Sequence, residues 1–150
     1  MDTNIYLHVS NKDSAAYFPQ NEPCLFRVKL KNTLNLQGRW KIGLCSIDMN
    51  NVDVKDSDMI DAKQVYITCN ICTGLIVDGA QTRVVRCIEL DTDIHMRYTR
   101  IFYLPVEVQF LDTVEFSITT DLLKPAVFEV NKSSKGGVGY VSMTLHLKRC

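Results

Sequence analysis

In the stretch Val138-Gly-Tyr-Val-Ser-Met-Thr-Leu-His-Leu-Lys-Arg149, apolar and polar side chains alternate without a break from Val141 to Lys148. Apolar residues occupy every second position from Val141 to Leu147, and Ser, Thr, His and Lys fall between them. A period of two residues is typical of a β-strand that has one face in a core and the other in water. On a helix, the same apolar residues would spread around the whole circumference. Because a long amphipathic strand needs a sheet to join, we expect the rest of the chain to supply one.

The length and charge of the chain limit the classes of protein to consider. Its 150 residues suit one domain, and we predict a single domain over residues 1–150. Lysine plus arginine and aspartate plus glutamate number 17 each, so no overall field favours nucleic acid or a charged membrane. No apolar run approaches the length of a membrane span, and residues 1–4 do not resemble a secretory signal. We therefore expect the protein to be made in the cytoplasm or nucleus.

Seven further segments have strand character, and turn residues such as Asp78-Gly79 separate them. In the clearest of them Phe26, Val28 and Leu30 face one way, and in another Trp40 marks the apolar face. No segment shows a long helical period. The sequence therefore predicts an all-β fold, an antiparallel β-sandwich, and specifically a single jelly roll of about eight strands. The segments are 5–9, 25–31, 40–49, 63–73, 83–90, 113–119 and 126–130.

Six cysteines raise the question of metal or redox chemistry, above all at Cys69-Asn-Ile-Cys72. A structural zinc site would need a second pair of ligands at similar spacing, and the sequence has none. The pair lies within a predicted strand, where positions three apart point to opposite faces. We therefore predict that these cysteines pack as free, buried or half-buried thiols.

The segment from residue 50 to residue 62 is polar and acidic, which suggests calcium as an alternative to a solvated loop. Its aspartates lack the central glycine and the terminal glutamate of an EF-hand loop, so we favour the solvated loop. The glycines at 136, 137 and 139 precede a strand and lack the lysine of a phosphate-binding loop. We predict neither a metal nor a cofactor.

The three histidines are the only ordinary candidates for a catalytic base. His95 lies in a predicted polar connection near Asp93, and that pair with a distant serine would be the enzyme hypothesis. No nucleophile-elbow motif supports it. We expect His146, on a polar strand face, to make a cross-strand contact. No catalytic residue is predicted, and the protein is not expected to be an enzyme.

Several phrases of the sequence occur in a familiar order. This order resembles the single jelly-roll minor capsid, or penton, proteins of Polinton/Maverick elements and adintovirus-like DNA viruses. The similarity runs from about Tyr17 to Arg149, but the Tyr-Pro step usual after the tryptophan strand is missing here. The phrases are Tyr17-Phe-Pro-Gln-Asn21, Leu25-Phe-Arg-Val-Lys-Leu30, Leu36-Gln-Gly-Arg-Trp-Lys-Ile-Gly-Leu44, Gly74-Leu-Ile-Val-Asp-Gly79, Arg83-Val-Val85, Tyr103-Leu-Pro-Val106, Val114-Glu-Phe-Ser-Ile118 and Val141-Ser-Met-Thr-Leu-His-Leu-Lys148.

The resemblance implies a structural protein of the virion capsid. Five copies would form a pentamer at a vertex and would contact a double jelly-roll major capsid protein. We predict interface residues in three segments, namely the N-terminal arm, the loop of residues 17–22 and the acidic loop of residues 53–61, and at two lysines near the last loop. They are Asp2, Asn4, Tyr6, Tyr17, Gln20, Glu22, Asp53, Asp56, Asp58, Lys132 and Lys135.

Two alternatives stay open. Lys132, Lys135, Lys148 and Arg149 form either a solvated basic face or a contact with packaged DNA or an acidic neighbouring subunit. The whole protein could instead be a β-sandwich module that binds glycans or other ligands. Such a module would present aromatic side chains on an open concave face, and the candidates are Tyr98, Phe102 and Tyr103.

Overall fold

The computed structural model describes residues 3–50, 52–56, 58–59, 61–90, 94–120, 126–130 and 140–150. These residues form thirteen β-strands and no helix, which confirms the all-β prediction. No helix able to cross a membrane occurs among them. The strands are β1 (Asn4–Ser10), β2 (Leu25–Asn35), β3 (Trp40–Asn50), β4 (Val52–Lys55), β5 (Gln64–Cys69), β6 (Ile76–Val77), β7 (Ala80–Gln81), β8 (Val84–Glu89), β9 (Ile94–Arg97), β10 (Leu104–Pro105), β11 (Phe110–Thr120), β12 (Val127–Val130) and β13 (Tyr140–Arg149).

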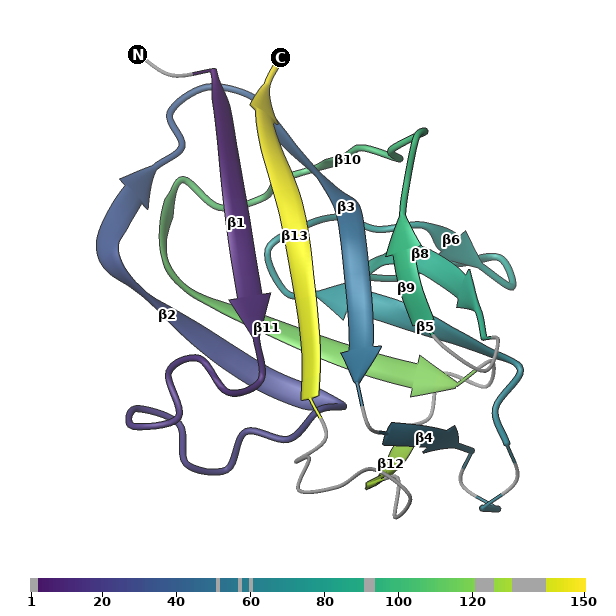
Figure 1. Ribbon diagram of the computed structural model, residues 1–150. Coiled ribbons are helices and arrows are strands. Elements are labelled where there is room, and N and C mark those ends of the chain that lie inside the picture. The colour runs from purple at the N-terminus through teal and green to yellow at the C-terminus, as the bar shows by residue number, and fades with distance from the viewer. Residues whose placement is uncertain are drawn as a thin grey trace.

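Two antiparallel sheets form the sandwich. The first sheet has the order β1-β13-β3-β10, with β9 also paired to β3, and the second has the order β2-β11-β5-β8. Figure 1 shows β1, β13 and β3 side by side in front of β2, β11 and β5, which cross behind them. The strands pair as nested partners, β1 with β13, β2 with β11, β3 with β9 and β5 with β8. Nested antiparallel pairs shared between two sheets are the topology of a jelly roll, which confirms the predicted architecture.

The core lies between the two sheets and consists of the inward positions of each strand. Phe26 of β2 and Phe116 of β11 are fully buried, and their ring centroids lie 5.5 Å apart. Trp40 is buried at the start of β3, and its indole N–H donates to the carbonyl of Gln37 at 3.1 Å. Burial of these alternating side chains provides the main favourable free energy of folding.

A bulge at Cys45 changes which positions of β3 face the core. Leu145 of β13 pairs with Leu44, whereas the preceding residue, Thr144, pairs with Ser46, so Cys45 is an extra residue on β3. Even-numbered positions are buried before the bulge, and odd-numbered positions such as Ile47 are buried after it. The bulge therefore keeps apolar side chains inward along the whole strand.

Two segments predicted as polar connections contain short strands. Within the predicted acidic loop, β4 pairs with β12, and within the predicted connection of residues 91–97, β9 pairs with β3. Both predictions were wrong because pairing with a distant strand satisfies the backbone hydrogen bonds of these polar segments. The predicted strand of residues 63–73 is also too long. It ends at Cys69, and a turn at residues 70–71 returns Cys72 to the core.

Candidate functional site: the outer face of the first sheet

The outer face of β13 was predicted to face water, and that prediction was partly wrong. Lys148 is exposed, but Ser142 is buried and His146 is only 7% exposed. The reason is that β13 is a central strand, with β1 on one side and β3 on the other. Side chains of these neighbours and of a crossing segment cover the middle of this face.

Gly43 of β3 allows a chain segment to lie directly on the outer face of the sheet. A Cβ atom at this position would stand 2.3 Å from Cγ2 of Ile101 and 2.9 Å from the carbonyl oxygen of Phe102. Residues 101–103 therefore pass over β3 at a distance that only glycine permits. This crossing brings Tyr103 to His146.

His146 is the centre of a cluster that we call the tyrosine–histidine cluster, formed by Asn4, Tyr6, Tyr103 and His146. The ring of Tyr6 stacks on the imidazole at 4.5 Å with 6° between the planes. Nε2 of His146 lies 2.8 Å from Oδ1 of Asn4, and Nδ1 lies 2.8 Å from the hydroxyl of Tyr103. Because an amide oxygen only accepts, Nε2 carries the proton and the tyrosine hydroxyl donates to Nδ1.

The cluster therefore uses the neutral form of His146. Burial lowers the pKa of His146, and the positive charge of Lys148 lowers it further. Burial also raises the pKa of Tyr103, which keeps its hydroxyl protonated as a donor. Tyr6 and His146 are register partners on β1 and β13, so the expected cross-strand contact of His146 is confirmed.

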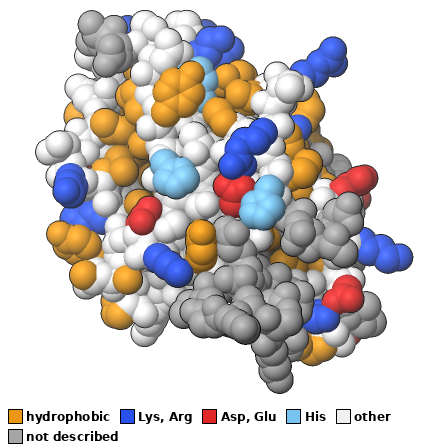
Figure 2. Space-filling model, viewed as in Figure 1, with side chains coloured by type: hydrophobic (Ala, Val, Ile, Leu, Met, Phe, Trp, Pro, Cys, Tyr) orange, Lys and Arg blue, Asp and Glu red, His pale blue; other side chains and the backbone are white. Residues whose placement is uncertain are grey.

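A second group on the same face joins β3 to β9. Asp48 accepts from Nδ1 of His95 at 2.9 Å and from both terminal nitrogens of Arg97 at 3.0 and 3.2 Å. Burial would raise the pKa of Asp48, but the hydrogen bonds from Arg97 and His95 outweigh it and lower the pKa. Figure 2 shows histidine side chains on this face.

This arrangement does not support the enzyme hypothesis based on His95. In the register of the sheet, Asp48 lies between Ser142 and His95, whereas a catalytic triad needs the histidine between the serine and the acid. Asp93 lies outside the described residues. Among the described residues, no group of three potential metal-ligating side chains occurs.

Two remaining places of chemical interest are the cysteine pair and a surface hollow. Cys69 and Cys72 are both buried in the core, so they do not point to opposite faces as predicted. A hydrogen bond with Cys72 and burial together raise the pKa of Cys69 well above its usual value.

The surface hollow, of about 300 Å³, is lined by one ionisable side chain, Glu107, whose carboxylate pairs with the guanidinium of Arg83 at 3.0 Å.

The aromatic residues of the glycan hypothesis do not share an open face. The guanidinium of Arg86 lies 3.5 Å from the ring centroid of Tyr98 and 4.6 Å from that of Phe102. Tyr103 packs edge-on against His146 instead. Stacking of a sugar on Tyr98 or Phe102 would therefore compete with Arg86.

The predicted interface residues are distributed over three parts of the molecule. Asn4 and Tyr6 belong to the tyrosine–histidine cluster, and Tyr6 keeps 66% of its surface exposed. Tyr17, Gln20 and Glu22 are exposed between β1 and β2. In the acidic segment, Oδ1 of Asp56 accepts from the backbone N–H of the exposed Asp58 at 2.8 Å. The side chain of Asp53, and the whole of Asp2, Lys132 and Lys135, lie outside the described residues.

The structure describes two members of the predicted basic group of the C-terminal region. Lys148 and Arg149 end β13, where their register partners on β3 are Lys41 and Trp40. Lys132 and Lys135 lie outside the described residues.

Sequence reasoning missed Lys41 and Gly43, and it named Tyr103 only as an aromatic ring for stacking a sugar, not as the partner of His146. Gly43 carried a usable signal, because a glycine inside an apolar strand often marks a close approach of another segment. The contacts of Lys41 and Tyr103 depend on strand order, which alternation does not reveal.

No family model matches the sequence, and no curated protein matches it. Matches to solved structures include the VP2 subviral particle of infectious bursal disease virus and the Gx strain of that virus, each at 9% identity and a TM-score of 0.23. The T13 viral particle of the same virus matches at 10% identity and a TM-score of 0.22. The matches cover 99% of this chain and 33 to 36% of those chains. This chain thus spans about a third of the solved chains, and superpositions this loose carry no argument here.

Proposed function

We propose that the protein is a non-enzymatic capsid subunit that associates with copies of itself and forms the pentameric penton at a vertex. The observation that carries the proposal is the nested pairing of eight strands in two sheets. Viral coat proteins are one of the main users of this topology. The order of sequence phrases shared with penton proteins adds support, and a double jelly-roll major capsid protein is the proposed second partner.

Exposed apolar side chains around the second sheet support an assembly role. Tyr17 before β2, Leu25 on β2 and Phe110 on β11 are 67%, 49% and 65% exposed. Large apolar groups at the surface favour contact with a partner. The balanced formal charge of the chain permits like subunits to pack without strong repulsion. In this proposal the mature location is the virion capsid.

Sedimentation velocity over a range of protein concentrations tests the proposal. We expect a species of about 86 kDa, five times the 17.1 kDa of the chain, to grow with concentration. Images of particles made with the major capsid protein should then place this chain at the five-fold vertices. A strict monomer at high concentration, or a particle without the chain at its vertices, would contradict the proposal.

One substitution tests the loop of residues 17–22 separately from the coat function. Tyr17→Glu places a charge at an aromatic residue that is 67% exposed and should weaken pentamer formation at least tenfold, about 1.4 kcal/mol per subunit contact. Ala80→Glu, on the exposed β6–β7 hairpin, adds the same charge elsewhere and serves as the control. Equal assembly of the two variants would remove this loop from the interface and leave the pentamer of the unmodified chain as evidence for the function.

A further inference from the structure

Two lysines are held next to each other at one end of the first sheet. Lys41 of β3 and Lys148 of β13 are directly opposite in the register of the two strands. Like charges at such positions are destabilising. Neither lysine belongs to any of the ion pairs formed by the described residues. We call these two residues the lysine pair.

Both members of the lysine pair are directed to the same aromatic ring. The ammonium group of Lys41 lies 5.6 Å from the ring centroid of Tyr103, and that of Lys148 lies 5.4 Å from it. The attraction between a cation and an aromatic ring therefore draws together two charges that would otherwise separate. Arg39 and Arg149 are exposed beside them, and the backbone N–H of Cys150 donates to the carbonyl of Arg39 at 2.9 Å. Lys41, Lys148, Arg39 and Arg149 therefore gather four basic side chains at this end of the sheet, although the formal charge of the whole chain is zero.

The side chain of Tyr6 stands next to this positive site with its orientation fixed. Its inner side stacks on His146, and its outer side is open, since the residue is 66% exposed. His146 and Lys148 are two positions apart on β13 and share its outer face. Figure 2 shows hydrophobic, basic and histidine side chains together in the upper part of this face. A fixed, exposed aromatic ring beside cations is the arrangement on which proteins stack unpaired bases.

We propose that the lysine pair and Tyr6 form a binding site for single-stranded nucleic acid. Lys41 and Lys148 contact backbone phosphates, and the open side of the Tyr6 ring stacks on a base. A phosphate bound by both lysines removes the repulsion between them. A single strand fits better than a duplex because bases within a duplex already stack on each other and cannot reach the ring. This site is additional to the proposed assembly of the coat.

Fluorescence anisotropy with a labelled thymidine oligonucleotide of about 20 nucleotides tests the proposal. The oligonucleotide should bind at about 50 mM salt, and a duplex of the same length should bind at least tenfold more weakly. Removal of two phosphate contacts in the Lys41→Ala/Lys148→Ala variant should weaken binding more than tenfold. It should also reduce the slope of log Kd against log salt by about 1.4, which is about 0.7 per lost contact.

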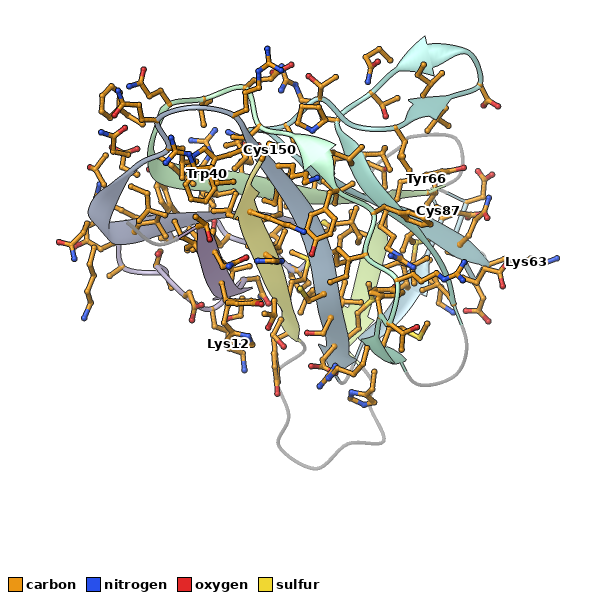
Figure 3. The ribbon with its side chains drawn as sticks, turned by 90° about the horizontal axis from the view of Figure 1, so that it is seen from above. Lys12, Trp40, Lys63, Tyr66, Cys87 and Cys150 are labelled. Atoms are coloured by element: carbon orange, nitrogen blue, oxygen red, sulfur yellow. The ribbon has the colours of Figure 1, made fainter. Side chains whose placement is uncertain are left out.

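Two further variants separate phosphate contact from stacking and from general charge. Tyr6→Leu should weaken binding roughly five- to tenfold while leaving the salt slope unchanged. Lys31→Ala/Lys63→Ala removes two exposed lysines outside the site and should change the affinity by less than about twofold. Figure 3 shows Lys63 on the opposite side of the molecule from Trp40 and Cys150, which mark the end with the lysine pair. Thermal unfolding should confirm that each variant is folded.

An NMR measurement detects whether the oligonucleotide occupies the site, independently of its affinity. Titration of the imidazole of His146 by NMR should give a higher pKa when the oligonucleotide is bound, because the bound phosphate cancels the charge of Lys148. Two other titratable groups contact this histidine, Tyr6 on β1 and Tyr103 in the crossing segment, and Lys41 and Cys45 on β3 in turn face Tyr103. The Lys148→Ala variant should not show this increase.

Five outcomes would overturn the proposal. The first four are absence of binding at low salt, equal affinity for single strand and duplex, equal loss of affinity in the two lysine double variants, and an unchanged pKa of His146 on binding. Polyglutamate of matched charge is the last comparison. If it displaces the oligonucleotide as well as an unlabelled oligonucleotide does, the site recognises acidic protein surfaces, and the nucleic-acid proposal is wrong.

Discussion

The outer faces of the two sheets are built from similar alternating strands but differ in what covers them. On the second sheet, the outward side chains of β2 are Arg27, Lys29 and Lys31, and all three are exposed. On the first sheet, Gly43 admits the crossing segment of residues 101–103, and His146 becomes buried on a face that alternation assigns to water. A polar outer position is therefore solvent-exposed only where no other segment crosses it.

The largest loss of stability is expected for a substitution at Gly43, where the crossing segment lies on the first sheet. Gly43→Val would place side-chain atoms into Ile101 and the backbone of Phe102, and should lower the free energy of unfolding by about 3 kcal/mol. Urea denaturation measures the loss. Lys31→Val puts the same side chain on the exposed outer face of β2 and should cost less than about 0.5 kcal/mol. Similar costs at the two positions would show that the crossing is not tightly packed.

The second prediction concerns His146. His146→Ala leaves the Tyr103 hydroxyl and the Asn4 amide without this partner, and should cost about 2 kcal/mol near pH 7.5. Because the pKa of His146 is lowered in the fold, the unfolded chain binds more protons as the pH falls below the unfolded value. Stability of the native protein then decreases with falling pH.

The difference between native protein and His146→Ala should therefore be smaller near pH 5.5 than near pH 7.5, as measured by urea denaturation at both values. His8→Ala is the control, because His8 is exposed and contacts only Thr144 among the bonds described for it, at 2.9 Å. It should cost less than about 1 kcal/mol. A difference that grows at low pH would contradict the neutral form of His146.

The smallest effects are expected for ion pairs, and they sharpen the contrast between the faces. A double-mutant cycle on Asp48 and Arg97 should give a coupling of about 1 kcal/mol, because the contact is bidentate and Asp48 is largely shielded. The same cycle on Arg27 and Glu115 of the second sheet should give about 0.3 kcal/mol, because one 3.1 Å contact joins more exposed groups. Stronger coupling on the second sheet would reverse this order.

The sequence was sufficient to predict the long strands and the class of fold. Alternation located the inward side chains of β2, β11 and β13, and the Asp78-Gly79 turn connects β6 to β7 as its chemistry suggests. Both turn residues have positive φ, at 50° and 78°, which suits a tight hairpin turn. These features are local, so the sequence displays them directly.

The candidate site could be predicted only in part because it depends on contacts between distant residues. Asn4 and Tyr6 were predicted as interface residues of the N-terminal arm, but their contact with His146 requires the pairing of β1 with β13. His95 was expected near Asp93, whereas its partner is Asp48, brought close by the pairing of β9 with β3. A short polar strand such as β9 has no periodic signal of its own, so its pairing is invisible in the sequence.

The nested strand pairing has a consequence for the order in which the protein can fold. The innermost pair, β5 with β8, joins residues close in sequence, whereas β1 with β13 joins residues more than a hundred positions apart. During synthesis β1 and β3 are both made before β13, the strand that lies between them in the sheet. Closure of the first sheet is then a late and slow event, as expected for long-range pairing. Until it occurs, the newly made chain exposes the edges of two strands to its neighbours.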